Sequence, residues 1–187
     1  IDEKSSIWLR INNGYSMKER PSKRIRNFEK WYSKRPEYVE RMLDRSEKYL
    51  FHVVGEVEKR KMPMEIALLP MIESAYNPIA TSRKKAAGMW QFIPSTGKIY
   101  GLEQNWWVDD RRSVMAATNA ALDYLEKLYK DFGTWELALA SYNAGEGRIG
   151  RAIKRNKRNK KSTSYYNLRL PKETKNYVPK LFAIKNI

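Results

Sequence analysis

The chain has 187 residues, and its 37 Lys and Arg against 21 Asp and Glu give a formal net charge of +16. Hydrophobic residues make up 42% of the chain and aromatic residues 12%, which is more apolar material than a disordered basic tail contains. We therefore expect one compact domain with a substantial core. The longest apolar stretches, such as residues 66–72, are too short to span a bilayer, so the sequence predicts no transmembrane helix.

The chain starts with Ile-Asp-Glu-Lys, without an initiator Met or a basic segment that leads into an apolar run. We therefore expect a piece of a longer precursor, with any signal or anchor upstream of Ile1. Cysteine is absent, which excludes disulfides, thiolate nucleophiles and cysteine zinc sites. His52 is the one histidine, which excludes His-x-x-x-His zinc pairs, and no acidic cluster has the spacing of a cation loop. The sequence predicts that no metal or organic cofactor is needed.

Apolar residues recur at helical spacing along nearly the whole chain, and no stretch of five or more residues alternates as a strand does. The expected fold class is all-α. After a polar, basic lead-in, the pattern predicts one long helix from Pro36 to about Lys61. Residues 64–74 are expected to form a buried helical segment that Pro70 kinks or divides. Residues 81–85 are expected to form a loop.

Residues 88–92 are predicted to form a short buried helix, and residues 94–101 a further turn that begins at a proline and ends at a glycine. Asp109 and Asp110 are the predicted N-cap of a long helix, because a carboxylate accepts hydrogen bonds from the first turn. Gly133 is expected to end that helix.

Thr134 is the predicted cap of the next helix, and a short amphipathic segment is expected from Arg148. Residues 151–161 include seven basic residues and no acidic one, and they are predicted to form an exposed loop. Pro171 is expected to start a last helix that runs toward the C-terminus.

Glu73 stands at the end of the apolar run over residues 66–72. A carboxyl group beside apolar packing loses hydration, which raises its pKa and makes it a candidate general acid. Taken alone, Glu73 also fits the solvent-facing end of an ordinary helix. The segments that follow it decide between these interpretations.

Four segments have the order and spacing of a known set of motifs. They are Glu73-Ser74-Ala75-Tyr76-Asn77-Pro78, Ala80-Thr81-Ser82, Ala87-Gly88-Met89-Trp90-Gln91-Phe92-Ile93-Pro94-Ser95-Thr96-Gly97 and Ala140-Ser141-Tyr142-Asn143-Ala144-Gly145. They resemble the lytic transglycosylases with a lysozyme-like domain, and most of all the membrane-bound lytic murein transglycosylase D subgroup. Segments 31–39, 62–70 and 170–180 resemble the lead-in and the closing helix of that subgroup. The resemblance therefore covers the chain from about residue 26 onward.

The resemblance implies a lysozyme-like helical domain, of the goose-type and soluble lytic transglycosylase kind, over residues 62–187. Residues 1–61 would be an N-terminal helical extension packed on it. It also implies that Glu73 is the sole catalytic acid/base, acting on the bond between N-acetylmuramic acid and N-acetylglucosamine. Glu73 would protonate the glycosidic oxygen and then take the proton of the muramoyl C6 hydroxyl, which leaves a 1,6-anhydromuramoyl end.

The resemblance further implies substrate-binding roles for six residues, which are Ser74, Ser82, Trp90, Gln91, Tyr142 and Asn143. Tyr142 is implied to be a direct neighbour of the acid. Trp90 stands where many relatives outside the subgroup have a Met that packs on the sugar. Asn143 is equally suited to tie the turn that follows it. Trp106, Trp107, Tyr76 and Tyr100 have rings able to stack on sugars, although such rings more often belong to a core.

Three other functions fit parts of the sequence. A muramidase, which hydrolyses the same bond on the same fold, needs a second carboxylate, and Glu103, Asp109 and Asp110 have no motif that places them opposite Glu73. A nucleic-acid-binding module would use the basic excess, but anionic wall polymers attract the same surface. A non-catalytic wall-binding domain would not need the intact motif around Glu73.

We therefore expect peptidoglycan glycan strands as the partner, no nucleic acid, and a monomer. The expected location is the periplasm and cell envelope. Membrane association would come only from a lipid anchor upstream of this chain, which would attach the protein to the outer membrane.

Overall fold

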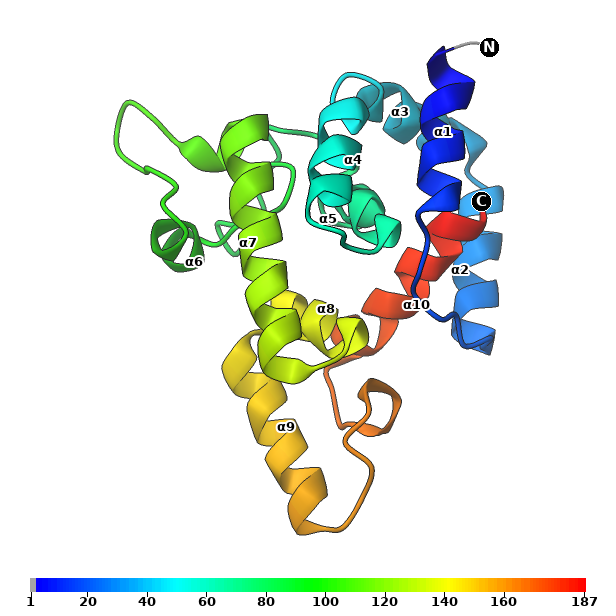
Figure 1. Ribbon diagram of the computed structural model, residues 1–187, viewed down its shortest axis with the longest axis vertical. Coiled ribbons are helices and arrows are strands. Elements are labelled where there is room, and N and C mark those ends of the chain that lie inside the picture. The colour runs from blue at the N-terminus through cyan, green and yellow to red at the C-terminus, as the bar shows by residue number, and fades with distance from the viewer. Residues whose placement is uncertain (1–2) are drawn as a thin grey trace.

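A computed structural model describes the backbone of residues 3–187 and the side chains of residues 6–187. Over this range the chain is an assembly of helices joined by short one-turn helices and loops (Figure 1). Strand pairing among the described residues is limited to isolated bridges, which join Thr81 to Ala87, Ala87 to Phe92 and Gln104 to Asp109. The all-α fold class is confirmed.

Two helices lie in the segment expected to be a lead-in. They are α1 (Glu3–Asn13) and α2 (Lys23–Ser33). The wholly buried carboxyl group of Glu65 accepts hydrogen bonds from the backbone N–H groups of Ser16 (3.0 Å) and Met17 (2.7 Å). Because buried acceptors of this kind need such donors, Glu65 fixes the link between α1 and α2 onto the rest of the protein.

The single helix predicted over residues 36–61 is two helices, α3 (Pro36–Ser46) and α4 (Leu50–Lys59). At the break, the N–H of Tyr49 donates to the carbonyl oxygen of Ser46 (3.0 Å), and the buried Ser46 hydroxyl donates to that of Leu43 (2.6 Å). The break is about one helical turn long, so the apolar positions on its two sides stay in phase. The apolar spacing therefore cannot reveal it.

The next segment divides as predicted, into the 3-10 helix η1 (Met64–Leu68) and α5 (Leu69–Ser74), with Pro70 in the first turn of α5. The helix predicted over residues 88–92 is wrong. Gly88 has a φ of +85° and Gln91 a φ of +54°, and the segment forms turns closed by the bridge between Ala87 and Phe92. Helix α6 (Pro94–Ile99) then starts at the proline.

Asp109 caps the one-turn helix η2 (Asp110–Arg112) rather than a long helix. The N-cap of α7 (Val114–Phe132) is Ser113, whose hydroxyl accepts a hydrogen bond from the N–H of Ala116 (3.3 Å), which corrects the predicted cap. As predicted, α7 ends at Gly133, which has a φ of +82°, and Thr134 caps α8 (Trp135–Ala144).

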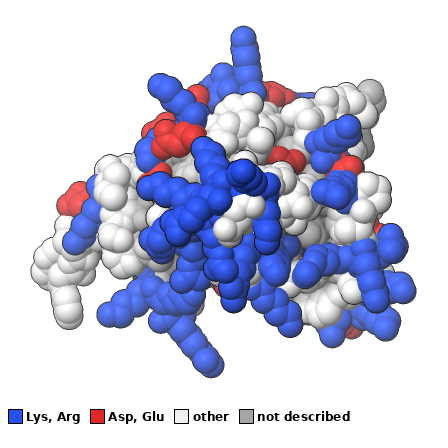
Figure 2. Space-filling model, turned by 90° about the horizontal axis from the view of Figure 1, so that it is seen from below, with Lys and Arg blue, Asp and Glu red and all other residues white. Residues whose placement is uncertain are grey.

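Helix α9 (Glu146–Arg158) covers most of the segment predicted to be an exposed loop. Lys and Arg are good helix formers, and Ile149 and Asn156 give α9 a buried side against the rest of the protein. The basic side chains lie on the other side, and Lys and Arg dominate the face of the molecule seen in Figure 2. The prediction of a loop was wrong because it rested on the density of charge alone and did not take this buried side into account.

The chain ends with the one-turn helix η3 (Tyr165–Asn167) and with α10 (Lys172–Asn186), which begins after Pro171 as predicted. Helix α10 packs against α2, α8, α5 and η1, so it joins the two ends of the chain (Figure 1). Helix α7 packs on α8 and α4. Among the described residues, no helix has the length and apolar content needed to cross a bilayer.

Candidate active site

Glu73 lies in the last turn of α5, and the backbone after it has an unusual shape. Ala75 and Tyr76 both have left-handed backbone angles, with φ values of +50° and +61°. Non-glycine residues adopt this conformation at a cost, so it persists only where the surroundings hold it. Here the buried Tyr76 hydroxyl donates to the carbonyl oxygen of Ala67 (2.6 Å), which fixes the end of α5 and the direction of Glu73.

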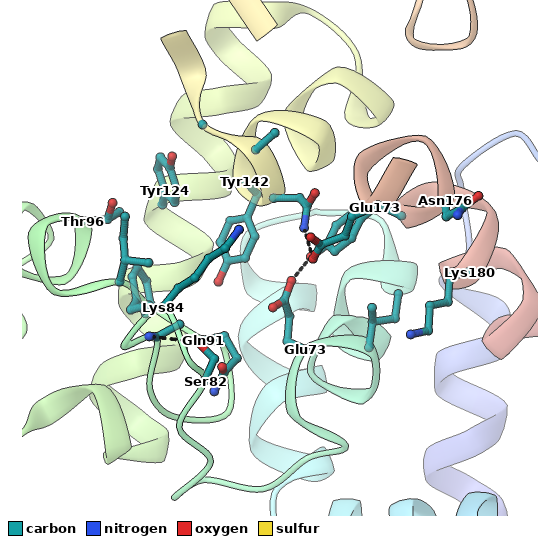
Figure 3. A pocket seen from close by; sticks show the side chains of 18 of the residues that line it. Glu73, Ser82, Lys84, Gln91, Thr96, Tyr124, Tyr142, Glu173, Asn176 and Lys180 are labelled. Carbon is teal, nitrogen blue, oxygen red and sulfur yellow. Dashed lines mark hydrogen bonds between the residues drawn. The ribbon is translucent and has the colours of Figure 1, made fainter. Parts of the chain in front are cut away.

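Glu73 opens into a cleft of about 770 Å³, a size typical of a ligand site. The cleft is lined by residues of α5, of the loop and helix over residues 82–96, of α7, of α8 and of α10 (Figure 3). Five of the residues singled out from the sequence line it, namely Glu73, Ser82, Gln91, Tyr142 and Asn143.

Burial raises the pKa of Glu73 from its ordinary value of 4.5 to about 7. The hydrogen bond that the Tyr177 hydroxyl donates to Oε1 of Glu73 acts in the opposite direction, as does the positive charge of Lys180, whereas the nearby Glu173 carboxylate raises the pKa further. Near neutral pH, Glu73 therefore populates both the protonated and the ionised form, which is what an acid that must later act as a base requires.

Tyr142 lies beside Glu73, and its hydroxyl donates to the backbone carbonyl of Trp90 (2.6 Å). Burial, and then the charge of Glu73, hold the pKa of Tyr142 well above its usual value, so it stays neutral. Its ring begins a row of three tyrosines. The ring of Tyr124 lies 5.5 Å from that of Tyr142, and the ring of Tyr100, at the end of α6, lies 5.0 Å from that of Tyr124.

Ser82 and Gln91 belong to the loop that forms one wall of the cleft. The Ser82 hydroxyl accepts a hydrogen bond from the N–H of Ala86 (3.2 Å). The side-chain amide of Gln91 donates to the carbonyl oxygens of Ala80 (3.1 Å) and Gly88 (2.7 Å). Gln91 therefore holds the loop in shape as well as facing the cleft.

Asn143 connects α8 to α10. Its side-chain oxygen accepts from the Thr174 hydroxyl (2.8 Å), and its side-chain nitrogen donates to Glu173 (3.3 Å). Asn143 thus has a structural role, which its sequence position also suggested, and a position on the cleft wall.

Ser74 and Trp90 are not among the residues that line the cleft. The Ser74 hydroxyl donates to the carbonyl oxygen of Met89 (2.8 Å). The Trp90 side chain is 0% exposed, and its indole N–H donates to Thr118 (3.0 Å). Its ring is part of the core and offers no surface to a sugar, which corrects the implied contact. The backbone of Trp90 instead positions Tyr142.

The contribution of α10 to the cleft was not predicted from the sequence. Glu173, Asn176, Tyr177 and Lys180 all line the cleft from this helix. Figure 3 labels Glu173, Asn176 and Lys180. Their spacing of three and four residues places them on one face, and this polar stripe was the signal available in the sequence. Nothing in the sequence shows that the stripe faces Glu73, because the two lie about a hundred residues apart and meet only through packing.

A helical domain whose cleft holds a desolvated carboxyl group is consistent with the lysozyme-like class of folds. In agreement with this, residues 54–165 match the Transglycosylase SLT domain family, and the chain belongs to that family.

Relatives extend this comparison beyond the family match. The chain is 47% identical to membrane-bound lytic murein transglycosylase D of Escherichia coli K12 over 182 residues, which is 97% of this chain and 40% of that protein. It is 47% identical over 110 residues to a putative tributyltin chloride resistance protein of an Alteromonas species, covering 58% of this chain and 53% of the relative. Peptidoglycan transglycosylase gp16 of phage T7 is 41% identical over 80 residues, which is 42% of this chain and 6% of that protein.

Proposed function

We propose that this chain is the catalytic part of a peptidoglycan lytic transglycosylase. It would cleave the β-1,4 bond between N-acetylmuramic acid and N-acetylglucosamine without water, as a carbon–oxygen lyase. The observation that carries this proposal is Glu73, a carboxyl group that burial holds near a pKa of about 7 inside the cleft. The family and the names of two relatives support the same chemistry.

The reaction needs one group that gives a proton and then accepts one. Because Tyr177 donates to Oε1 of Glu73, we place the reactive proton on Oε2. Glu73 gives this proton to the glycosidic oxygen as the bond from that oxygen to muramoyl C1 breaks. The muramoyl C6 oxygen then bonds to C1, and its proton passes to the Glu73 carboxylate. The products are a free hydroxyl end and a 1,6-anhydro end, and Glu73 is again protonated.

The remaining cleft residues would hold the sugar. Ser82, Gln91 and Asn143 carry polar groups at the cleft surface that suit an acetamido or hydroxyl group. Tyr142, kept neutral by burial, would exclude water and present an apolar ring beside Glu73 without adding a competing charge.

A muramidase on the same fold is the second candidate, because Glu173 also lines the cleft. In an inverting hydrolase this carboxylate would activate a water molecule on the far side of the sugar ring. Glu173 is exposed, and it receives a hydrogen bond from Asn143. The lyase mechanism uses Glu173 only through its charge.

Digestion of purified sacculi followed by mass spectrometry of the fragments separates these functions. We expect wild-type protein to release fragments with 1,6-anhydro ends, Glu73→Gln to release none, and Glu173→Gln to release anhydro fragments. Fragments with reducing ends, lost in Glu173→Gln, would instead establish the muramidase. Turnover by Glu73→Gln at the wild-type rate would refute both.

We further propose that residues 62–187 form the catalytic domain and residues 1–61 a helical extension, which is supported by the packing of α2 on α10 and of α1 and α4 on η1. The name of the Escherichia coli relative supports a place in the cell envelope for the whole protein. The periplasm, a monomeric state and an upstream lipid anchor are part of the same proposal, with glycan strands rather than nucleic acid as the partner.

A further inference from the structure

The loop between α6 and α7 exposes two adjacent tryptophans. Trp106 and Trp107 are 91% and 87% exposed, and Ile99, Val108 and Met115 are exposed apolar residues close by in the chain. The loop projects beyond α6 at the left of Figure 1. These two rings are not part of the core, so the usual reason for an aromatic residue in a helical domain does not apply to them. Clustered exposed apolar groups of this kind mark binding surfaces.

The loop is held in one shape by its own hydrogen bonds. The side-chain oxygen of Asn105 accepts from the N–H groups of Trp107 (2.8 Å) and Val108 (2.8 Å), and the N–H of Asn105 donates to the carbonyl oxygen of Val108 (2.8 Å). The bridge between Gln104 and Asp109 closes the base of the loop. The two rings are thus presented on a fixed turn, and a ligand would meet a preorganised surface.

The base of the loop is also attached to the wall of the cleft. The side-chain amide of Gln104 donates to the carbonyl oxygen of Pro94 (2.9 Å). Arg111 forms an ion pair with Asp109 (2.8 Å) and donates to the carbonyl oxygens of Lys85 (2.7 Å) and Phe92 (3.0 Å). Gln104 and Arg111 therefore hold the loop that carries the tryptophans against the segment that carries Ser82 and Gln91.

The row of tyrosines starts in the cleft, which Tyr142 and Tyr124 line, and leads to the end of α6, from which the chain continues into this loop. It runs from Tyr142, beside Glu73, through Tyr124 to Tyr100, which directly follows α6. In Figure 3, Thr96 of α6 and Tyr124 lie at one end of the cleft, opposite Lys180. A linear polymer that leaves the cleft at the α6 end would therefore run toward the tryptophan loop.

The charge around the tryptophans indicates what kind of polymer fits. Residues 103–112 carry three acidic and two basic side chains, in a chain whose formal net charge is +16. Of the two basic side chains, Arg111 is paired with Asp109. An anionic partner such as a phospholipid surface would meet a better surface on the basic face of Figure 2. Flat indole rings among neutral and acidic groups instead suit an uncharged, hydroxyl-bearing ring.

We propose that Trp106 and Trp107 form a distal sugar-binding platform, which stacks on amino-sugar rings of a glycan strand that extends beyond the cleft at its α6 end. This inference rests on the proposed function, since it takes the same polymer as ligand. The platform adds affinity only for strands long enough to reach it. It therefore makes the protein favour long glycan strands over short fragments.

The test uses the Glu73→Gln protein, which we expect to bind without turnover, and linear β-1,4-linked N-acetylglucosamine oligomers as the probe. We expect Trp106→Leu/Trp107→Leu to weaken calorimetric binding of a long oligomer about tenfold, which is about 1.4 kcal/mol, and to leave binding of the disaccharide unchanged. Leucine keeps the loop apolar and removes the flat rings. Phe51→Ala is the matched control, because Phe51 is 72% exposed on α4 and should leave both affinities unchanged.

A second measurement does not depend on the variant. The indole N–H resonances of Trp106 and Trp107 should shift when the long oligomer is added and should stay in place with the disaccharide. Unchanged affinity of the Leu variant for the long oligomer, or unshifted indole resonances, would overturn the proposal. The proposal would also be overturned if the Leu variant lost binding to anionic phospholipid vesicles and kept its affinity for the long oligomer. The tryptophans would then bind a membrane surface.

The proposed function is judged separately, on the anhydro fragments that wild-type protein releases from sacculi. If those fragments appear and the platform tests fail, only the platform is wrong. If wild-type protein releases none, the proposed function fails whatever the tryptophans bind.

Discussion

The raised pKa of Glu73 makes a stability prediction that needs no substrate. Between pH 4.5 and about 7, the folded protein holds a proton that the unfolded chain has released, so this group lowers the free energy of unfolding as the pH rises through that window. The stabilisation that the protonated Glu73 carboxyl group gives the folded state is fully present below pH 4.5. A shift from 4.5 to about 7 amounts to roughly 3 kcal/mol, at about 1.36 kcal/mol for each pKa unit. Glu73→Gln removes the charge while keeping the size of the side chain.

We therefore expect Glu73→Gln to be as stable as wild type near pH 4 and more stable by about 3 kcal/mol at pH 8. The assay is urea unfolding followed by tryptophan fluorescence at a series of pH values. Glu40→Gln, at an exposed position of α3, is the matched control and should differ from wild type by less than about 0.5 kcal/mol at each pH. If the curves of Glu73→Gln and wild type run parallel from pH 4 to pH 8, burial does not raise the pKa of this carboxyl group.

Tyr177→Phe removes the hydrogen bond that lowers the pKa of Glu73, so the alkaline limb of the pH–activity profile should move to higher pH, and an unmoved limb would contradict the assigned contact. Gly88→Ala should prevent stable folding, because the added Cβ would lie 1.7 Å from the carbonyl oxygen of Arg111. Gly101→Ala, which also has a positive φ but open space around it, should lower the free energy of unfolding by only about 1 kcal/mol, and equal losses in urea unfolding would refute the steric argument. Exchange of four basic residues near the end of α9 for Gln should weaken association with sacculi at low salt only, since exposed charges are screened within about 10 Å at 0.1 M salt; equal low-salt binding would exclude this role. The four are Lys157, Arg158, Lys160 and Lys161.

The sequence was most informative where the chemistry is local. A cap such as Thr134 or an end such as Gly133 depends on a few neighbouring residues, and both were predicted correctly. The motif segments also identified Glu73 and several cleft residues, because those segments fix short stretches of backbone around the site. The motifs did not distinguish a side chain from its backbone, and at Trp90 it is the carbonyl group that faces Tyr142.

The sequence was least informative where distant segments meet. The turns at residues 88–92 depend on the backbone of Arg111 lying against Gly88, and no local pattern contains that approach. The same is true of Tyr177, whose hydroxyl reaches Glu73 only because α10 packs on α5. Helix periodicity identifies which face of α10 is polar, and packing alone decides what that face meets.

Helix α10 brings Tyr177 and Lys180 close to Glu73, and it also packs along α2. The span that matches the family, residues 54–165, ends before α10 and begins after α2. A fragment trimmed to that span would keep Glu73 and Tyr142 and would lose the hydroxyl and ammonium groups that adjust the acid. Its pH optimum, and not merely its solubility, would then differ from that of the longer chain. The groups that adjust the pKa of Glu73 therefore extend beyond the residues that match the family, into a helix that also packs along α2.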